Sequence, residues 1–447
     1  MLDGCTPWPE VFVDRYRAAG HWRGHTLDDL LRGWALEHGP RTALVQGDTR
    51  LTYARLNRRV DRMAAGFRLR GLRPGQRVVV QLPHVPELVV TAFALMRAGV
   101  IPVFCPLSYR ASQVAHAAHV SEAAGYVGPS MYEGVDHRAT AAGIAARWPF
   151  LRRVFTYEAP GTSSPYGGLA TDPSGCHYFP LDSVDAPPDR PLAQSAGQVA
   201  FFLLAAETTE TPRLIPRTHD DYTYQVRAAA ESITLTENDV YLAALPAEFT
   251  LTFGCPGILG TLSVGGTAVL AENQTPAECL ALIAQERVTF TSVVPAVARH
   301  WLEELPKTQA DLTSLRLAQL GGAPVDRRTA RRLGTGLSCR VQQLYATPEG
   351  LLLLTPPTAP DDAALAGHGR PLSPDDEIRI VDTDDKDVPP GTPGELLIRG
   401  PHTPRGYYRA PDDNTHAVTP DGYFRTGTVA RSTENGTLTV TGRLAKG

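Results

Sequence analysis

The sequence predicts an α/β protein that consists of two stacked α/β units followed by a smaller β-rich unit. Three observations support this fold class. The 447 residues suffice for about three domains of ~150 residues, strand-like and helix-like apolar segments alternate up to about residue 305, and short β runs separated by turn residues follow from residue 377. Apolar residues make up 43% of the chain and charged residues 20%, which is typical of a globular protein and argues against a disordered or fibrous one.

The first unit contains a βαβ pattern between residues 78 and 107. A strand is predicted over 78–82, Pro86 begins a helix, Gly99 ends it, and a second strand follows over 100–104. Continuously apolar strands of this kind indicate a parallel sheet that is covered on both faces.

The same alternation returns in the second unit. Strands are predicted over 239–245, 267–270 and 288–294, and helices over 255–262, 276–286 and 295–305. The β-rich unit is expected to contain strands at 377–381, 394–398, 422–424 and 437–440. Residues 157–192 are rich in Gly, Pro, Ser and Asp and are expected to form a long surface excursion. We therefore divide the chain into a first α/β subdomain (1–200), a second α/β subdomain (201–365), a β-rich subdomain (366–441) and a hinge remnant (442–447).

Composition and simple motifs exclude several classes of function. The net charge of −4 gives no basic field for nucleic acid, and no segment is apolar enough to span a membrane or to act as a secretory signal. Six scattered cysteines without zinc spacing indicate reduced thiols in a cytoplasm. Hydrolase and metalloprotease motifs are missing from the sequence.

A series of motifs in a fixed order carries a family resemblance. The segments are 214–222 (LIPRTHDDY), 245–246 (LP), 321–323 (GGA), 342–350 (QQLYATPEG), 369–371 (GRP), 394–400 (GELLIRG) and 422–427 (GYFRTG). With them, the chain resembles the adenylate-forming ligases over essentially its whole length. It is most similar to the stand-alone aryl-acid AMP ligases of the 2,3-dihydroxybenzoate type, which load carrier proteins in siderophore and nonribosomal peptide pathways. The resemblance implies the N-terminal portion of such a ligase, with the ligand cleft between its subdomains, and we expect the family's mobile C-terminal domain and its lysine to be absent from this sequence.

The resemblance implies a two-step reaction. A carboxylate attacks the α-phosphate of ATP, giving an acyl-AMP and pyrophosphate, and a thiol on a carrier protein or coenzyme A then displaces AMP. ATP and Mg²⁺ are the implied cofactors, and catalysis depends on positioning and on neutralising the charge that moves to the leaving group.

The implied phosphate loop, residues 204–213, departs from the family's pattern. Its hydroxyls remain as Thr208 and Thr209 and its basic end as Arg213. Where small residues or glycines are expected, the sequence has Ala205, Ala206, Glu207 and Glu210. Glycine lets backbone N–H groups approach an anion, and each carboxylate ~4–6 Å from a polyphosphate costs on the order of 1 kcal/mol or more. The loop is either a solvated turn or a phosphate loop with both glutamates turned outward.

The implied ribose clamp is altered, whereas the implied metal ligand is kept. Thr428 replaces the aspartate that accepts hydrogen bonds from both ribose hydroxyls, so nucleotide affinity should fall. The alternative to a functional Thr428 is an ordinary turn between β strands. Glu349 matches the acid that holds Mg²⁺, although a solvated loop acid is the alternative, and Tyr345 matches the adenine neighbour. Arg443 matches the hinge-proximal arginine, and Lys446 replaces the hinge acid.

The implied acid pocket has also changed. Its candidate residues are Glu248, Phe249, Thr250, Cys255, Gly321 and Gly322. Phe249 and Thr250 replace the family's His-Asn pair, which weakens the case for 2,3-dihydroxybenzoate itself and suggests a more apolar pocket. Glu248 suits an amine if it faces inward. The alternative is a solvated Glu248 with Phe249 in the core.

Two further groups are ambiguous from sequence. Arg327, Arg328, Arg331 and Arg332 form one basic stripe on a predicted helix, either as a solvated face or as a docking site for an acidic carrier protein. The segment His219-Asp220-Asp221 is interpreted as the capped start of a helix.

The main functional hypothesis is an aryl- or acyl-acid AMP ligase-like protein of natural-product biosynthesis whose ATP-dependent adenylation is impaired or lost. Such a pseudoenzyme would keep a cleft for a small acid or a carrier-bound acyl group and would use no cofactor. The first alternative is a divergent but active ligase that uses ATP and Mg²⁺. The second is a non-enzymatic partner of a carrier protein or of an active paralogue.

Overall fold

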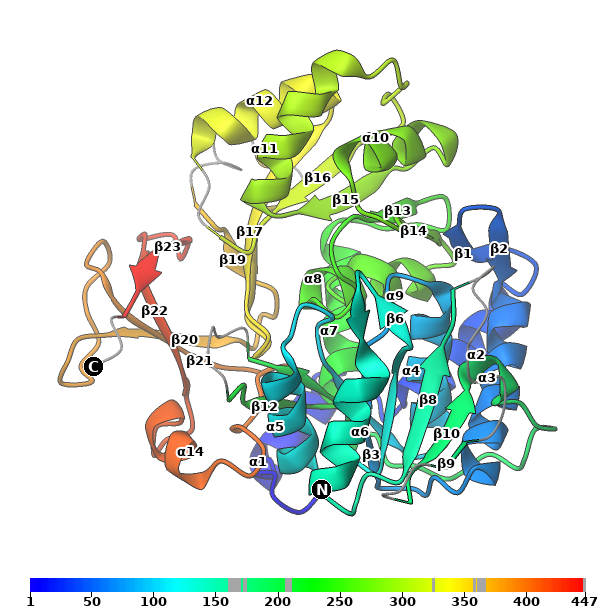
Figure 1. Ribbon diagram of the computed structural model, residues 1–447. Coiled ribbons are helices and arrows are strands. Elements are labelled where there is room, and N and C mark those ends of the chain that lie inside the picture. Colours follow the sequence, from blue (N-terminus) through cyan, green and yellow to red (C-terminus); the bar gives the residue numbers. More distant parts are fainter. Residues whose placement is uncertain are drawn as a thin grey trace.

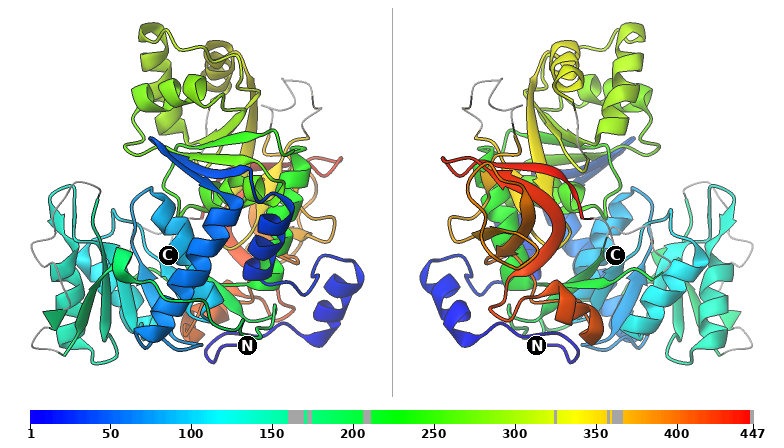
Figure 2. Two further views of the ribbon diagram at one scale, coloured as in Figure 1. Left: turned by 90° about the vertical axis from the view of Figure 1, so that its right-hand side faces the viewer. Right: turned by 90° about the vertical axis from the view of Figure 1, so that its left-hand side faces the viewer.

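The computed structural model describes residues 1–159, 170–171, 175–205, 211–323, 326–356, 359 and 367–444. Two α/β units lie one above the other, and a β-rich unit projects to one side of both (Figures 1 and 2). This arrangement confirms the predicted fold class. None of the helices in the described ranges is long and apolar enough to cross a membrane.

The lower unit is built on an eight-stranded sheet whose strands run in the order β12-β11-β4-β3-β5-β8-β10-β9. The strands are β3 (Arg77–Val80), β4 (Ile101–Phe104), β5 (Gly125–Pro129), β8 (Arg153–Tyr157), β9 (Ala170–Thr171), β10 (His177–Pro180), β11 (Val199–Leu204) and β12 (Leu214–Thr218). Its central strands pair in parallel, and β9 and β12 are antiparallel edges.

Helices cover both faces of this sheet because successive strand residues point to opposite sides. Val78 and Val80 pack toward α3 (Tyr53–Leu69) and α4 (Pro86–Arg97), whereas Val79 packs toward α5 (Ala111–Ser121) and α6 (His137–Arg147). Pro86 is the first residue of α4, as predicted, because proline lacks the N–H that an initial helical turn leaves unpaired anyway.

The upper unit is built on a nine-stranded sheet with the order β19-β18-β17-β16-β15-β13-β14-β1-β2. Its strands are β1 (Thr42–Gln46), β2 (Thr49–Thr52), β13 (Val240–Ala243), β14 (Thr267–Leu270), β15 (Phe290–Val293), β16 (Leu317–Leu320), β17 (Arg340–Ala346), β18 (Leu352–Leu354) and β19 (Arg370–Pro371). Helices α10 (Pro276–Gln285), α11 (Pro295–Glu304) and α12 (Arg327–Leu337) share one apolar core with this sheet. Between the sheets lie α2 (Leu27–Glu37), α7 (His219–Ser232), α8 (Thr250–Phe253) and α9 (Gly257–Ser263).

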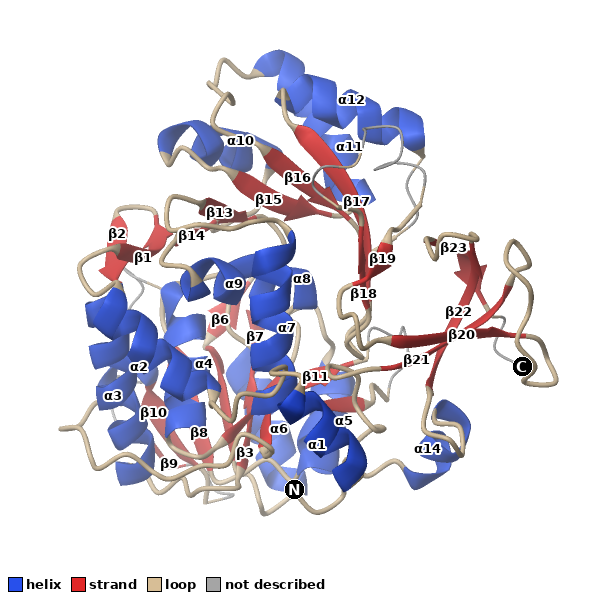
Figure 3. Cartoon of the chain, turned by 180° about the vertical axis from the view of Figure 1, so that it is seen from behind, coloured by secondary structure: helices blue, strands red, loops and turns tan. Residues whose placement is uncertain are grey.

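The β-rich unit is an antiparallel sheet of β20 (Glu377–Val381), β21 (Gly394–Arg399), β22 (Phe424–Ser432) and β23 (Leu438–Arg443), with α14 (Pro411–Ala417) beside it (Figure 3). The N-terminal helix α1 (Glu10–Ala18) ties this unit to the rest of the chain. Arg15 pairs with Asp375 at 2.6 Å and with Glu377 at 3.0 Å. The remaining elements are short: the hairpin β6 (Met131–Tyr132) and β7 (Val135–Asp136), and the 3₁₀ turns η1 (Leu181–Ser183) and η2 (Leu305–Lys307).

Two expectations need correction. Residues 157–192 are not a surface excursion throughout, because β10 within them pairs in parallel with β8 in the lower sheet. The boundary drawn at residues 200 and 201 falls inside β11, and both β11 and β12 belong to the lower sheet. In the other direction, β1 and β2 join the upper sheet. The division into subdomains stays a proposal, with the two α/β units interleaved along the chain.

Candidate ligand cavity and acid pocket

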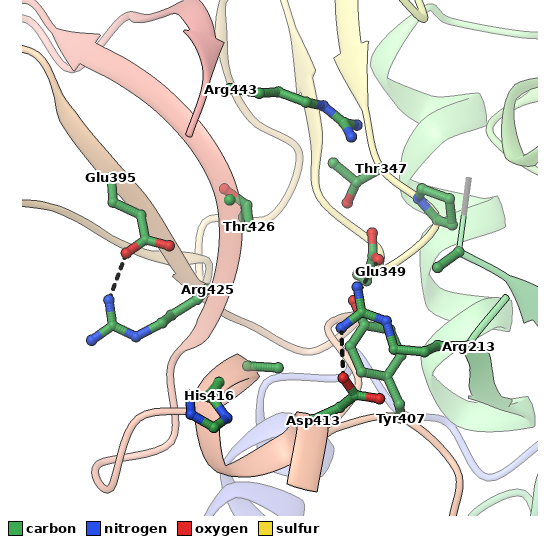
Figure 4. Close-up of a pocket in the computed structure, with 14 residues that line it drawn as sticks. Arg213, Thr347, Glu349, Glu395, Tyr407, Asp413, His416, Arg425, Thr426 and Arg443 are labelled. Atoms are coloured by element: carbon green, nitrogen blue, oxygen red, sulfur yellow. Dashed lines mark hydrogen bonds and ion pairs between the residues drawn. The ribbon is translucent and has the colours of Figure 1, made fainter. Parts of the chain in front are cut away.

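A cavity of about 320 Å³ opens where the β-rich unit faces the two α/β units (Figure 4). It is lined by Ala205, Arg213, Thr347, Pro348, Glu349, Glu395, Tyr407, Asp413, His416, Ala417, Arg425, Thr426, Gly427 and Arg443. The cavity therefore brings together three of the predicted site residues, Arg213, Glu349 and Arg443. Thr208 and Thr209, the other phosphate-loop candidates, lie outside the described residues.

Glu349 is presented by a tight turn that follows β17. The Gly350 N–H donates to the Thr347 carbonyl at 3.0 Å, and the Thr347 N–H donates to the Leu351 carbonyl at 2.9 Å. Gly350 has a φ of +106°, and an added Cβ would lie 1.9 Å from the His402 carbonyl oxygen, so only glycine fits there. The Tyr407 hydroxyl donates to Oε1 of Glu349 at 3.0 Å.

Buried polar side chains hold this turn from behind. Arg217 donates to the Pro348 carbonyl at 3.3 Å, and both Gln225 Nε2 and His402 Nδ1 donate to the Gly350 carbonyl at 2.7 Å. Arg217 is fully buried and its charge is balanced by Asp221 at 2.8 Å. Sequence reasoning missed the positioning role of these residues. Arg217 belongs to the motif at residues 214–222, but the neighbouring sequence does not indicate that its side chain contacts a loop 131 residues away.

The segment that starts α7 is capped as predicted. Thr218 is the N-cap residue, and Asp221 bonds back to the Thr218 backbone to complete a capping box. His219 instead accepts a hydrogen bond from the Leu27 N–H at 3.1 Å, and burial lowers its pKa to about 4. A neutral imidazole at this place is a packing element between α7 and α2.

The predicted ribose and adenine residues are bonded to each other. The hydroxyl oxygens of Thr428 and Tyr345 are 2.7 Å apart and share a hydrogen bond, and Thr428 is fully buried. Burial raises the pKa of Tyr345, which keeps its hydroxyl neutral. Neither residue lines the cavity, although Thr426 and Gly427 do.

The cations of the cavity differ in how they are engaged. Arg425 pairs with Glu395 at 2.5 Å and also with Asp385. Arg443, on β23, extends its side chain toward Thr347 (Figure 4), and both residues line the cavity. Among the described residues no group of three or more His, Cys, Asp or Glu side chains could hold a metal ion. Glu349 is thus a lone carboxylate that fits Mg²⁺ only together with ligand oxygens, which is a common way of binding this ion.

None of the six predicted acid-pocket residues lines this cavity. Glu248 is partly buried, and desolvation raises the pKa of its carboxyl to about 7. It also contributes, after burial, to the raised pKa of Cys105 and of Tyr109. Glu248 therefore lies beside the lower sheet. The alternative in which Glu248 is simply solvated is wrong.

The other acid-pocket candidates have mixed environments. Phe249 is 43% exposed, so the alternative that placed it in the core is wrong. Thr250 and Cys255 are buried, and burial raises the pKa of the Cys255 thiol to about 12. At Gly321 an added Cβ would lie 2.4 Å from the Leu344 side chain, and Gly322 has a φ of +84°. The positive φ favours glycine at position 322 irrespective of any ligand.

The basic stripe lies on the outer face of α12. Arg327, Arg328, Arg331 and Arg332 are all exposed, while Ala330, Leu333 and Leu337 pack inward against the upper sheet. This confirms the predicted helix and its solvent-facing arginines.

The fold is that of the N-terminal part of the adenylate-forming ligase family, and the comparisons with known proteins agree. A model of the AMP-binding enzyme family matches residues 31–408, so the chain belongs to that family. Triostin synthetase I of Streptomyces triostinicus is 43% identical over 99% of this chain and 80% of its own length. The 2,3-dihydroxybenzoate-AMP ligase of Bacillus subtilis is 39% identical over 99% of this chain and 79% of its own.

A solved structure gives the same result. The apo structure of MbtA from Mycobacterium smegmatis superimposes with a TM-score of 0.90 at 38% identity, over 99% of this chain and 80% of that one. The resemblance to aryl-acid AMP ligases and the predicted N-terminal ligase fold are therefore confirmed. The salicyl-AMP ligase / salicyl-S-ArCP synthetase of Mycobacterium tuberculosis, 40% identical over 99% of this chain and 77% of its own, is a further relative.

Proposed function

We propose that this protein is an aryl- or acyl-acid-binding relative of the AMP ligases of siderophore or nonribosomal peptide biosynthesis whose ATP-dependent adenylation is impaired. Its cleft then serves a small carboxylic acid or a carrier-bound acyl group without a nucleotide, in the cytoplasm. Relatives named for 2,3-dihydroxybenzoate and salicylate support an aryl acid as the ligand. The proposed function involves neither a nucleic acid nor a membrane as partner.

The observation that carries this proposal is the bond between Thr428 and Tyr345. In the family an anionic two-oxygen acceptor is expected at position 428, and here a buried neutral hydroxyl is already satisfied by a tyrosine at 2.7 Å. A ribose hydroxyl at Thr428 would meet a neutral oxygen that Tyr345 already shares, in place of two anionic oxygens, and hydrogen bonds to charged acceptors are the stronger ones. Glu207 and Glu210 of the implied phosphate loop would add repulsion in the same direction where they face the ligand.

The direct test is isothermal titration of the chain with Mg·ATP, with the Bacillus subtilis relative as positive control. We expect a dissociation constant weaker than about 1 mM, and micromolar binding overturns the proposal. A triple variant, Glu207→Gly, Glu210→Gly and Thr428→Asp, restores the expected loop and clamp. A gain in Mg·ATP affinity in that variant supports these residues as the cause.

A second candidate is a divergent but working ligase. It is favoured by one observation: Arg213, Glu349 and Arg443 line the same cavity. In that case ATP and Mg²⁺ are cofactors, and Glu349 would hold the ion. Pyrophosphate exchange that depends on an added aryl acid would decide in its favour.

The exposed arginines of α12 favour a third candidate, a binding partner of an acidic carrier protein. A quadruple change of Arg327, Arg328, Arg331 and Arg332 to Glu should abolish capture of a purified aryl carrier protein, and unchanged capture would remove this candidate. Exposed Arg299 on the neighbouring helix α11 provides a control substitution.

A further inference from the structure

Arg213, the basic end of the implied phosphate loop, is engaged from two sides by the β-rich unit. Its guanidinium lies 4.3 Å from the centre of the Tyr407 ring, and Nη1 lies 3.5 Å from Oδ1 of Asp413. Asp413 is in the first turn of α14, and its side chain is 51% exposed, against 24% for Arg213. The cation is therefore directed toward an acid of the chain itself.

Tyr407 connects this pair to Glu349. Its hydroxyl donates to Oε1 of Glu349 at 3.0 Å while its ring faces Arg213. Figure 4 shows Asp413, Arg213, Tyr407 and Glu349 side by side along one wall of the cavity. The cation that would meet phosphate and the acid that would meet a metal are thus both in contact with groups of the β-rich unit.

We propose that Asp413 acts as an internal anion that occupies Arg213 and thereby weakens the binding of phosphate ligands in the cavity. A carboxylate and a phosphate compete for the same guanidinium, because arginine binds both oxygen anions through charge-assisted hydrogen bonds. An incoming phosphate must displace Asp413 and then remain close to a like charge. This inference rests on the proposed function and adds a cause that is separate from the ribose clamp.

The remaining charged groups of the cavity do not remove the effect of Asp413. Arg425 is paired with Glu395 and Asp385, and His416 bonds to the Asp412 carbonyl at 3.0 Å. Arg443 extends toward Thr347 (Figure 4). Removal of one negative charge at Asp413 therefore changes the environment of Arg213 more than that of any other cation in the cavity.

The test compares Asp413→Asn with Asp412→Asn, using inorganic pyrophosphate as the probe in a calorimetric titration at low ionic strength. Asp412 is the adjacent residue on α14, is exposed and does not line the cavity, so it controls for net charge. We expect Asp413→Asn to bind pyrophosphate about fivefold more tightly than wild type and Asp412→Asn to be unchanged, because Asp413 is the acid of this pair that forms an ion pair with Arg213, at 3.5 Å. The gain should shrink in 0.5 M NaCl, since salt screens exposed charges.

Two results would overturn the proposal. One is equal affinity of wild type and Asp413→Asn, including the case in which neither binds measurably. The other is a gain that persists when Arg213→Gln is added to Asp413→Asn, because the acid would then act on a different cation. Asp413→Ser serves as a second variant should the asparagine protein fold poorly.

Failure of the Asp413 proposal can be told apart from failure of the proposed function. Micromolar binding of Mg·ATP by wild type would remove the proposed function, yet the difference between the two asparagine variants would still report on Asp413. Conversely, equal pyrophosphate affinities would remove the role of Asp413 and leave the Thr428 argument untouched.

Discussion

Replacement of Glu248 by glutamine is expected to stabilise the protein at alkaline pH and to have little effect at pH 5. Burial raises the pKa of the Glu248 carboxyl from 4.5 to about 7. Between these values the folded state keeps a proton that the unfolded state has lost, so the contribution of Glu248 to stability is fully present below pH 4.5 and is lost as the pH rises to 7. Above pH 7 a folded protein must hold a desolvated carboxylate.

The size of the effect follows from the shift. One pKa unit corresponds to about 1.4 kcal/mol, so the shift sets an upper bound of about 3 kcal/mol, and the partial exposure of Glu248 reduces the expected value to about 2 kcal/mol. A neutral glutamine avoids this penalty at every pH. The gain of Glu248→Gln over wild type should therefore be about 2 kcal/mol at pH 8 and only about 0.5 kcal/mol at pH 5.

Urea unfolding at both pH values measures this difference, with Glu272→Gln as a control at an exposed acid of the neighbouring loop. An equal effect of Glu248→Gln at pH 5 and pH 8 would refute the reasoning, as would a loss of stability at pH 8. The first result would mean that the carboxyl is solvated, and the second that a cation stabilises its charged form.

Three further predictions concern buried contacts. Thr428→Val should cost about 1–2 kcal/mol of unfolding free energy, because it leaves the Tyr345 hydroxyl without its partner, while Thr428→Ser should recover most of it in the same denaturant titration. Arg217→Met should cost about 3–5 kcal/mol, because Asp221 stays buried without its cation; a change below 1 kcal/mol in thermal unfolding would contradict this. Trp8→Ala should speed amide exchange in α1, since Arg405 packs 5.2 Å from the Trp8 ring centre, and exchange equal to wild type would count against that contact.

Much of the fold could be predicted because its signals are local. Pro86 and Gly99 mark the ends of α4 through properties of single residues, a missing N–H and a positive φ of 72°. The apolar runs of β3 and β4 show burial on both faces without any reference to their partners. The order of the family motifs then predicted how the three units are arranged, through the resemblance to the ligase fold.

Features that depend on distant pairing could not be predicted in the same way. The strand β10 lies in a segment rich in turn residues, and its pairing with β8 in the lower sheet overrides that local composition. The bond between Tyr345 and Thr428 joins positions 83 residues apart. Asp413 is an ordinary acid in the sequence and gains its meaning only because α14 places it opposite Arg213.

The balance of charge in the cavity explains why retained residues alone do not establish retained chemistry. Arg213, Arg425 and Arg443 are matched in number by Glu349, Glu395 and Asp413, so the lining is neutral in sum. A triphosphate is attracted by uncommitted positive charge and by donors, since hydrogen bonds to an anion must outweigh the loss of its hydration. Here at least two of the three cations already face an acid of the chain. The presence of Arg213, Glu349 and Arg443 in one cavity therefore does not by itself establish that the cavity binds Mg·ATP.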